Sequence, residues 1–174
     1  MFRRLLSSQE RREFVIVMRP MRRNKQQLSE DRCRELLRIL PRGVLAFSES
    51  EGYPYAVPID FYFDGEKNVI YFHGAKEGKK SELVAQEPKV CFVAYNDGYR
   101  KEDDWALTID SIIVYGRIHI VEDIDESLEV LKNMGRRYFP DKAEGEAAAE
   151  RNKGKALCYY MTIDTITGKT VHEK

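Results

Sequence analysis

The sequence lacks the features that mark membrane, zinc-binding and disulfide-stabilised proteins. No apolar run approaches the roughly 20 residues that a helix needs to cross a bilayer. The three cysteines, Cys33, Cys91 and Cys158, are single and far apart, so they form no CxxC pair and no cysteine–histidine cluster. This spacing argues against a structural zinc site or a disulfide framework. It favours core thiols in a reducing cytoplasm, above all for Cys91 and Cys158, which lie in strand-like runs.

Motifs of several enzyme classes are also missing. The chain shows no Ser-His-Asp order, no paired-carboxylate spacing, no metal-ligand motif and no internal repeat, so hydrolase and metalloenzyme readings have little support. What is present is a chain of 174 residues, 43% hydrophobic and 33% charged. That length and balance predict one soluble domain with a substantial core.

Charge is balanced overall but unevenly distributed. Residues 1–28 contain eight basic and two acidic residues, a balance of +6, so the remaining chain carries −6 in a protein of net charge zero. An acidic body argues against nucleic-acid binding. We expect a basic extension over 1–28 and one domain over 29–174. The extension could be an incorrectly assigned start, an unstructured arm, an arm that docks on a partner subunit, or an edge strand at Phe14–Val17; its two glutamates count against a transit peptide.

Helix signals are clear at two places. Ser29 is an N-cap residue followed by two acids, with apolar residues at helical spacing until Pro41 and Gly43 end the pattern. A second amphipathic helix is predicted over Ile124–Tyr138. Residues 140–155 are polar, and the run Ala147–Ala149 could hold a helical turn.

Strand signals dominate the rest of the chain. Buried or alternating runs with turn residues between them predict about six strands, at 44–47, 53–63, 69–73, 89–95, 111–121 and 156–163. We expect a bend at Gly116, irregular structure over 99–110 and a turn over 166–169. Strands in hairpin-like succession favour a mainly β (α+β) antiparallel barrel with flanking helices over a βαβ sheet.

The stretch that follows the strand at 69–73 has the composition of a phosphate site. His73 and Gly74 end the strand, and a loop with Lys76, Gly78, Lys79 and Lys80 leads into a short helix that Pro88 closes. Glycines let backbone N–H groups approach a ligand, a helix N-terminus is partly positive, and lysines add full charges. An ordinary strand-to-helix connection with solvated lysines remains an alternative from the spacing alone.

The order of these segments resembles a known family. GVLAF, GYPYAVPIDF, VIYFHGAKEGKK, EPKVCFVAY, SIIVYGRIHIVED, a helix and a final ITGK follow one another over roughly residues 28–170. This order is similar to the 5-nitroimidazole-resistance (Nim-type) proteins of the FMN-binding split-barrel superfamily, which also contains pyridoxamine 5′-phosphate oxidase. The resemblance implies a homodimeric split β-barrel that binds FMN between its subunits. The cytoplasmic location is expected from the cysteines, and neither nucleic acid nor membrane is expected as a partner.

The resemblance also implies roles for particular residues. Val57, Pro58 and Ile59 would line the flavin ring, with Asp60 beside them, and His73 and Gly74 would end a strand near the flavin. Lys79 and Lys80 match the Arg-Lys phosphate pair of the oxidase branch. Further cofactor contacts would come from Ser111, at the head of a strand, and from Lys169, in the C-terminal Gly-Lys of the Nim branch.

The implied activity is the reduction of nitroimidazole-like or other small electron acceptors. His73 could donate a proton or only line the pocket, because an ordinary histidine pKa lies near neutrality. Trp105, the single tryptophan, is a candidate lid over the flavin. The oxidase's Arg-x-Val-Leu-Leu-Lys segment and C-terminal Arg-Leu segment are missing, which argues against pyridoxamine phosphate oxidation. The alternatives are a flavin carrier or sensor without turnover, and a haem-binding barrel with His73 as axial ligand.

Overall fold

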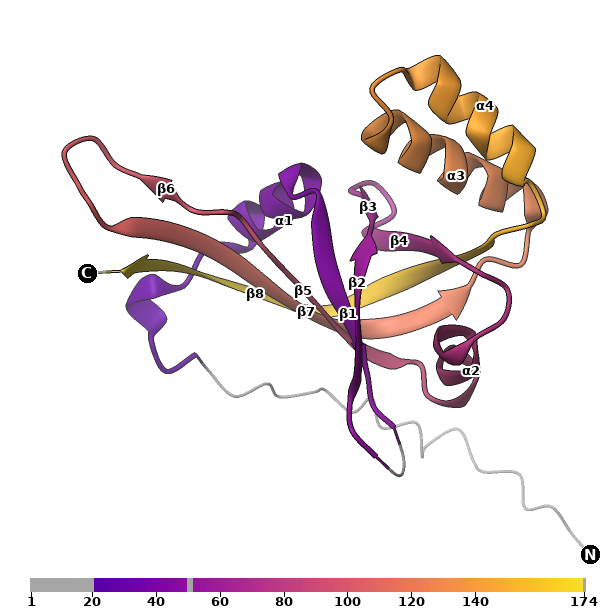
Figure 1. Cartoon of the computed structure of the whole chain (residues 1–174). Coiled ribbons are helices and arrows are strands. Elements are labelled where there is room, and N and C mark those ends of the chain that lie inside the picture. Colours follow the sequence, from indigo (N-terminus) through magenta and orange to yellow (C-terminus); the bar gives the residue numbers. More distant parts are fainter. Residues whose placement is uncertain (1–20, 50–51, 174) are drawn as a thin grey trace, which may run out of the picture.

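The computed structural model describes residues 21–49 and 52–173, which form one curved antiparallel sheet with helices around its margins (Figure 1). The strands are β1 Arg42–Phe47, β2 Tyr55–Asp60, β3 Tyr62–Asp64, β4 Val69–Gly74, β5 Lys89–Tyr95, β6 Tyr99–Arg100, β7 Leu107–Ile120 and β8 Leu157–Glu173. The helices are the 3₁₀ turn η1 Asn24–Gln26 and the α-helices α1 Glu30–Ile39, α2 Lys79–Gln86, α3 Ile124–Tyr138 and α4 Lys142–Asn152.

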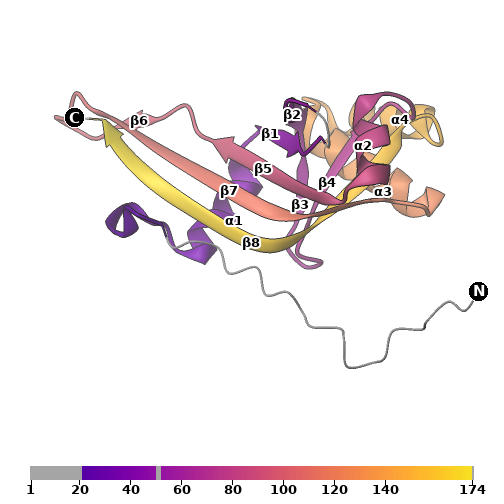
Figure 2. The ribbon, with the colours of Figure 1, turned by 90° about the horizontal axis from the view of Figure 1, so that it is seen from below.

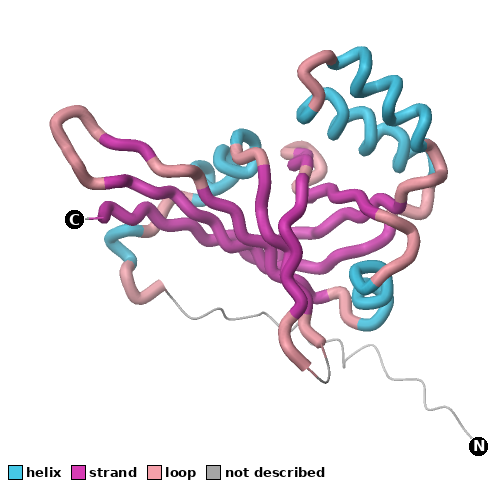
Figure 3. The backbone as a smooth tube through the Cα atoms, viewed as in Figure 1, coloured by secondary structure: helices cyan, strands magenta, loops and turns pink. Residues whose placement is uncertain are grey.

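The sheet curls into a half-barrel. Its strand order is β2-β1-β5-β7-β8-β4-β3, with β6 added beside β7. The long strands β7 and β8 run side by side along the molecule, as the view from below shows (Figure 2). Strands form the centre and the helices lie around them (Figure 3). The prediction of a mainly β antiparallel split barrel with flanking helices is confirmed.

Helix α1 contributes its apolar face to the main hydrophobic core. The Ser29 hydroxyl accepts a hydrogen bond from the Arg32 N–H at 3.2 Å, which satisfies one of the unpaired donors at the helix start. Cys33, Leu36 and Leu37 follow at helical spacing and are buried. They pack with the sheet's inner residues, such as Phe72, Phe92 and Tyr159. The helix predicted after Ser29 is therefore present, and its apolar residues face the core as expected.

The extended segment predicted at 53–63 is two strands. Residues Tyr55–Asp60 pair with β1 at one edge of the sheet, whereas Tyr62–Asp64 pair with β4 at the other edge. Phe61 lies between them with a fully buried ring, and the hydroxyl of Tyr138 accepts a hydrogen bond from its N–H at 2.9 Å. The segment therefore crosses the barrel. Pro58 sits in the edge strand β2, where a missing N–H is tolerated.

The last strand is longer than the sequence predicted. The expected turn at 166–169 is wrong, because those residues continue in β8, which pairs with β7 over 14 residues of β7. Part of the irregular region at 99–110 is also strand, as β6 and the start of β7. The bend at Gly116 is confirmed as a register shift between Tyr115 and Gly116. A Cβ at Gly116 would lie 1.8 Å from the Thr162 carbonyl oxygen, so only glycine fits.

Helices α3 and α4 form a hairpin that packs beside β3 and β4 (Figure 1). Carboxylates cap both helices: Asp123 accepts bonds from the N–H groups of Asp125 and Glu126, and Asp141 accepts one from Ala143. Helix α3 agrees with its prediction. Helix α4 is longer than the single turn expected near Ala147–Ala149. It packs on α3 through small residues such as Gly145, which give no apolar periodicity in the sequence.

The short described part of the N-terminal extension lies against β8. Gln27 bridges to Lys169, and the N–H of Leu28 donates to the Gly168 carbonyl at 2.9 Å. The predicted edge strand at Phe14–Val17 lies outside the described residues.

In the part of the chain that the structure describes, no helix has the length and apolar character needed to span a bilayer.

Candidate functional site

The segment Val57–Asp60 and the end of β4 meet at one cavity of about 350 Å³. Its lining consists of Arg42, Val57, Pro58, Ile59, Asp60, His73 and Lys80. Val57–Asp60 lie in the edge strand β2, and His73 lies near the C-terminal end of β4. Six of the residues predicted for the cofactor therefore share one cavity, although they come from separate elements.

Lys80 is the cation at this cavity that lacks an acidic partner. Its Nζ donates to the His73 carbonyl oxygen at 3.0 Å and lies 5.2 Å from the centre of the Tyr159 ring. No carboxylate lies within ion-pair distance of it among the described residues. Partial burial lowers the pKa of Lys80, because the ammonium loses hydration without gaining a counter-charge. An anion in the cavity would supply that counter-charge.

Lys79 and the start of α2 lie beside this cavity. The Lys79 ammonium pairs with Glu49 at 2.7 Å and lies 5.2 Å from the Tyr55 ring centre. Helix α2 begins after Gly78, which has φ +126° and gives the helix no side-chain cap. The first N–H groups of α2 are therefore uncapped by any side chain, next to two lysines.

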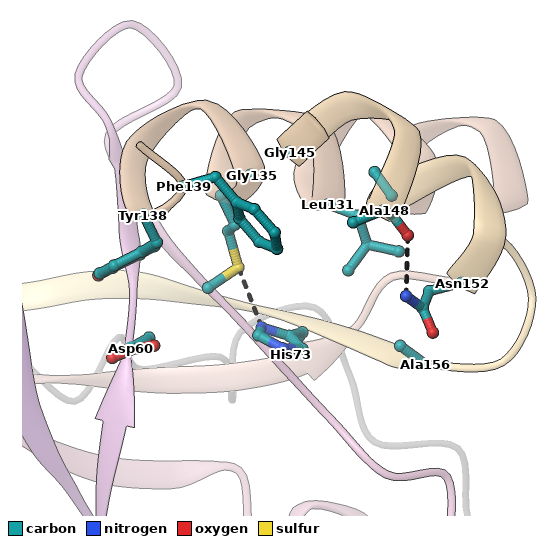
Figure 4. Close-up of a pocket in the computed structure, with 12 residues that line it drawn as sticks. Asp60, His73, Leu131, Gly135, Tyr138, Phe139, Gly145, Ala148, Asn152 and Ala156 are labelled. Carbon is teal, nitrogen blue, oxygen red and sulfur yellow. Dashed lines mark hydrogen bonds between the residues drawn. The ribbon is translucent and has the colours of Figure 1, made fainter. Parts of the chain in front are cut away.

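His73 stands between this cavity and a second one, beneath α3 and α4 (Figure 4). Its Nδ1 lies 3.3 Å from the Met134 sulfur, and its ring stays accessible to solvent. Protein around the ring, followed by the charge of Lys80, lowers the pKa of His73 below its usual value, while Asp60 acts in the opposite direction. The surroundings therefore favour the neutral form of the imidazole.

Arg42 is a site residue that the sequence analysis missed. Its Nε donates to the Asp60 carboxylate at 2.8 Å, so the acid at the cavity wall is neutralised by a cation from β1. The two residues are directly opposite each other in the β1–β2 ladder. The register of the β1–β2 hairpin places them together. The sequence offered one signal for this pair: a basic residue at the start of one strand and an acidic residue at the end of the next strand, which an antiparallel hairpin brings opposite each other.

Ser111 and Lys169 lie elsewhere in the chain. They are opposite each other in the β7–β8 ladder, on the sheet face that also carries Tyr95. They line neither of the cavities that contain His73. Trp105, the candidate lid, is 74% exposed in the loop before β7, where its carbonyl accepts a bond from Arg100. Within one chain the structure thus separates these residues from His73 and Lys80.

The residues at the cavity fit FMN. The partly buried Lys80 without a counter-ion, the uncapped start of α2 and the nearby Lys79 are what a phosphate requires. Val57, Pro58 and Ile59 of the extended strand β2 supply an apolar part of the cavity lining. Among the described residues no cluster of His, Cys, Asp or Glu could hold a metal ion.

The sheet architecture gives the class of fold, and comparison with known protein families gives the family. The curled antiparallel half-barrel is a split-barrel fold, and a family model described as pyridoxamine 5′-phosphate oxidase matches residues 29–170. The chain belongs to this family. No curated protein matches the sequence.

Three solved structures illustrate the likeness in fold. A protein described as a candidate 5-nitroimidazole antibiotic resistance protein from Bacteroides thetaiotaomicron is 19% identical, with a TM-score of 0.68 over 84% of this chain and 87% of that one. An FAD-binding protein from Mesorhizobium loti is 20% identical, with a TM-score of 0.62 over 84% and 97%. An FAD- and haem-binding protein from Mycobacterium smegmatis is 20% identical, with a TM-score of 0.67 over 83% and 72%.

Proposed function

We propose that the protein is an FMN-dependent oxidoreductase that reduces nitroimidazole-like or other small electron acceptors. The observation that carries this proposal is Lys80, a partly buried lysine without an acidic partner, at the start of α2 and beside His73. Family membership and flavin-binding neighbours of the same fold add support. The missing oxidase segments are the reason we do not propose pyridoxamine phosphate as substrate.

Each part of the cavity would have one task. Lys80 and Lys79, with the N–H groups at the start of α2, would bind the phosphate. Val57–Ile59 would orient the ring, and the Arg42–Asp60 pair would close one side. When bound, FMN supplies the electron-transfer chemistry itself.

His73 would handle the proton. Its Nδ1 faces the Met134 thioether, which can only accept a hydrogen bond, so in the neutral ring Nε2 is the unprotonated nitrogen. Nε2 would exchange a proton with the substrate, and it would deliver one only after taking one up. Lys80 keeps the ring from accumulating positive charge, since its ammonium disfavours imidazolium. A neutral His73 imidazole and an uncharged substrate both need little hydration, so water could be excluded from the contact between them.

We further propose a homodimer with FMN between the subunits. Large apolar side chains are exposed on the outer face of the central strands: Tyr95 is 62% exposed, Ile113 39% and Tyr115 36%. Cross-strand pairing puts them on the face that carries Ser111 and Lys169. If two such faces packed together, one subunit's Ser111 and Lys169 would be available to the other subunit's cavity.

The visible absorption spectrum of the purified protein tests the proposal. We expect flavin bands in the wild type, weakened or lost in the Lys79→Ala/Lys80→Ala double variant but retained in Lys76→Ala, which removes an exposed lysine of the same loop. A colourless wild type that does not take up added FMN would contradict the proposal. If flavin is retained, oxidation of NAD(P)H with a nitro compound separates an enzyme from a carrier or sensor.

The same spectrum addresses haem binding, which the Mycobacterium smegmatis neighbour makes a second candidate. His73 is accessible in a cavity, as an axial ligand must be, and Nε2 is the nitrogen left for iron because Nδ1 contacts Met134. A Soret band that disappears in His73→Ala would favour haem. Flavin bands without a Soret band would exclude it.

A further inference from the structure

A second cavity of about 370 Å³ lies on the other side of His73, between the sheet and the α3–α4 hairpin. Figure 4 shows its arrangement: His73 forms the floor, Tyr138 and Phe139 stand at one end, and Asn152 and Ala156 at the other. The two helices form the roof. Its volume lies within the range of roughly 300–1,000 Å³ typical of small-molecule sites.

The roof is apolar and its shape depends on two glycines. A Cβ on Gly145 would lie 2.6 Å from backbone atoms of Gly135, so the helices touch backbone to backbone at this point. Leu131 extends downward from α3, and Ala148 contributes only a methyl group from α4. Met134, also on α3, has its sulfur 3.3 Å from the His73 Nδ1. The two helices touch through their glycines, and small side chains such as Ala148 leave the space between the helices and the sheet open. Larger residues at these positions would fill the cavity.

The polar groups around the cavity carry no unpaired charge. The Asp60 carboxylate is held by Arg42 at 2.8 Å, and the Tyr138 hydroxyl is committed to the backbone of Pro41 and Phe61. The Asn152 amide donates to the Ala148 carbonyl at 2.8 Å. His73 and the side-chain carbonyl of Asn152, at opposite ends of the cavity, are thus the polar groups that remain for a ligand. The only side-chain partner of His73 in the described chain is a thioether.

His73 and Asp60 also belong to the wall of the proposed flavin cavity. The two cavities are therefore neighbours, separated by a single imidazole and a neutralised acid. A molecule in the second cavity would place one end at His73, on the side where the flavin cavity begins, and its remaining surface among apolar side chains.

We propose that this cavity binds the apolar, ring-containing body of a small uncharged molecule, whose one polar group is held at His73. This inference deepens the proposed function by giving the substrate's chemical class, and it rests on that function only for the adjacency of flavin. A charged ligand is disfavoured, since it would leave water for a site without an unpaired counter-charge.

Direct binding to the FMN-loaded protein tests the inference. Three probes of the same size are titrated and followed by ligand-observed NMR: 2-naphthylmethanol, which can hydrogen-bond; 2-methylnaphthalene, which cannot; and 2-naphthoate, which is charged. We expect the alcohol to bind at least roughly tenfold more tightly than the carboxylate. Tightest binding by the carboxylate, or binding of none of the three, would overturn the proposal.

A cavity-filling variant identifies the location. Ala148→Phe places a ring in the cavity, and Ala143→Phe places the same ring on the exposed start of α4. We expect Ala148→Phe to weaken alcohol binding by roughly tenfold or more and Ala143→Phe to leave it unchanged. Circular dichroism and flavin content serve as checks that both variants are folded. Equal affinities in the two folded variants would place the probe elsewhere and refute the site.

The role of His73 is read from a ratio. The affinity of the alcohol relative to 2-methylnaphthalene should fall by roughly three- to tenfold in His73→Leu, the value of one hydrogen bond. An unchanged ratio would remove His73 from the proposal. Protein that binds no FMN would defeat the proposed function, whereas the same titrations without FMN would still decide whether the cavity takes uncharged ring compounds.

Discussion

The Lys80 ammonium donates a hydrogen bond to the carbonyl oxygen of His73, at 3.0 Å. This contact joins the strand end at β4 to the first turn of α2 and holds the cation at the cavity. The same cation lowers the pKa of the His73 ring. Two residues seven apart in the sequence are therefore coupled at one end of the cavity, where burial of the ring and then the charge of Lys80 both lower the His73 pKa.

Replacement of Lys80 should weaken FMN binding more than replacement of any neighbouring lysine. A hydrogen bond to a charged group contributes about 1.5–3 kcal/mol, so Lys80→Ala should raise the Kd for FMN by roughly ten- to a hundredfold. Fluorescence titration of the flavin measures it, with Lys76→Ala as control. Because the pKa of Lys80 is lowered, affinity should also begin to fall at a lower pH than for an ordinary lysine. Equal effects of the two substitutions would contradict this assignment.

His73 should titrate below the usual pKa of histidine, and Lys80→Ala should move it upward. In the native state the ring binds a proton less readily than in the unfolded chain, so this residue makes stability rise with pH between its lowered pKa and the ordinary value. NMR of the imidazole signals across a pH series measures the His73 pKa in the wild type and in Lys80→Ala. A His73 pKa at or above the ordinary value in the wild type would refute the electrostatic account.

Gly145→Ala should destabilise the protein, although glycine-to-alanine changes inside helices usually stabilise. The added methyl group would meet the Gly135 backbone, and overpacking of this kind costs about 1–3 kcal/mol. Urea unfolding followed by circular dichroism gives the change. Ala147→Gly, on the same helix, should lose only the propensity difference of about 0.5–1 kcal/mol. A gain in stability for Gly145→Ala would show that the helices can separate freely.

Tyr138→Phe should loosen the α3–α4 hairpin from the barrel. The hydroxyl contacts the carbonyl oxygens of Pro41 and Phe61 at 2.6 and 2.7 Å and accepts from the Phe61 N–H at 2.9 Å. Loss of these partners should lower the free energy of unfolding by about 1–3 kcal/mol. Tyr53→Phe, at a side chain that is 91% exposed, should stay within about 0.5 kcal/mol of the wild type. Similar losses in both variants would argue that the hydroxyl network contributes little.

Ile113→Glu should dissociate the proposed dimer. A carboxylate at the centre of the outer sheet face would be buried without a partner if two such faces packed together. Light scattering after gel filtration should give a dimer for the wild type and a monomer for the variant, with reduced flavin content. Ile124→Glu, on α3 at a side chain that is 51% exposed, is the matched control. A monomeric wild type that retains FMN would eliminate the shared site.

Much of the local structure could be predicted, because it depends on signals within a few residues. Ser29 with its two following acids defined the start of α1, and Gly116 indicated the bend in β7. Errors occurred where distant strands decide the outcome. The segment 166–169 has turn-like residues but is held in β8 by its ladder with β7, and α4 forms because Gly145 fits against Gly135.

From short-range pattern and composition, the sequence by itself determined a mainly β antiparallel barrel, the His73–Lys80 loop and the absence of metal, zinc and disulfide motifs. The split-barrel class came from the resemblance of its segment order to a known family. Tertiary structure alone decided which of these residues meet. Strand register placed Arg42 on Asp60, and the crossing at Phe61 separated β2 from β3. The hairpin of α3 and α4 created a cavity from residues with no motif of their own. Side chains far apart in sequence share a site only through strand pairing and helix packing, and neither is encoded in local spacing.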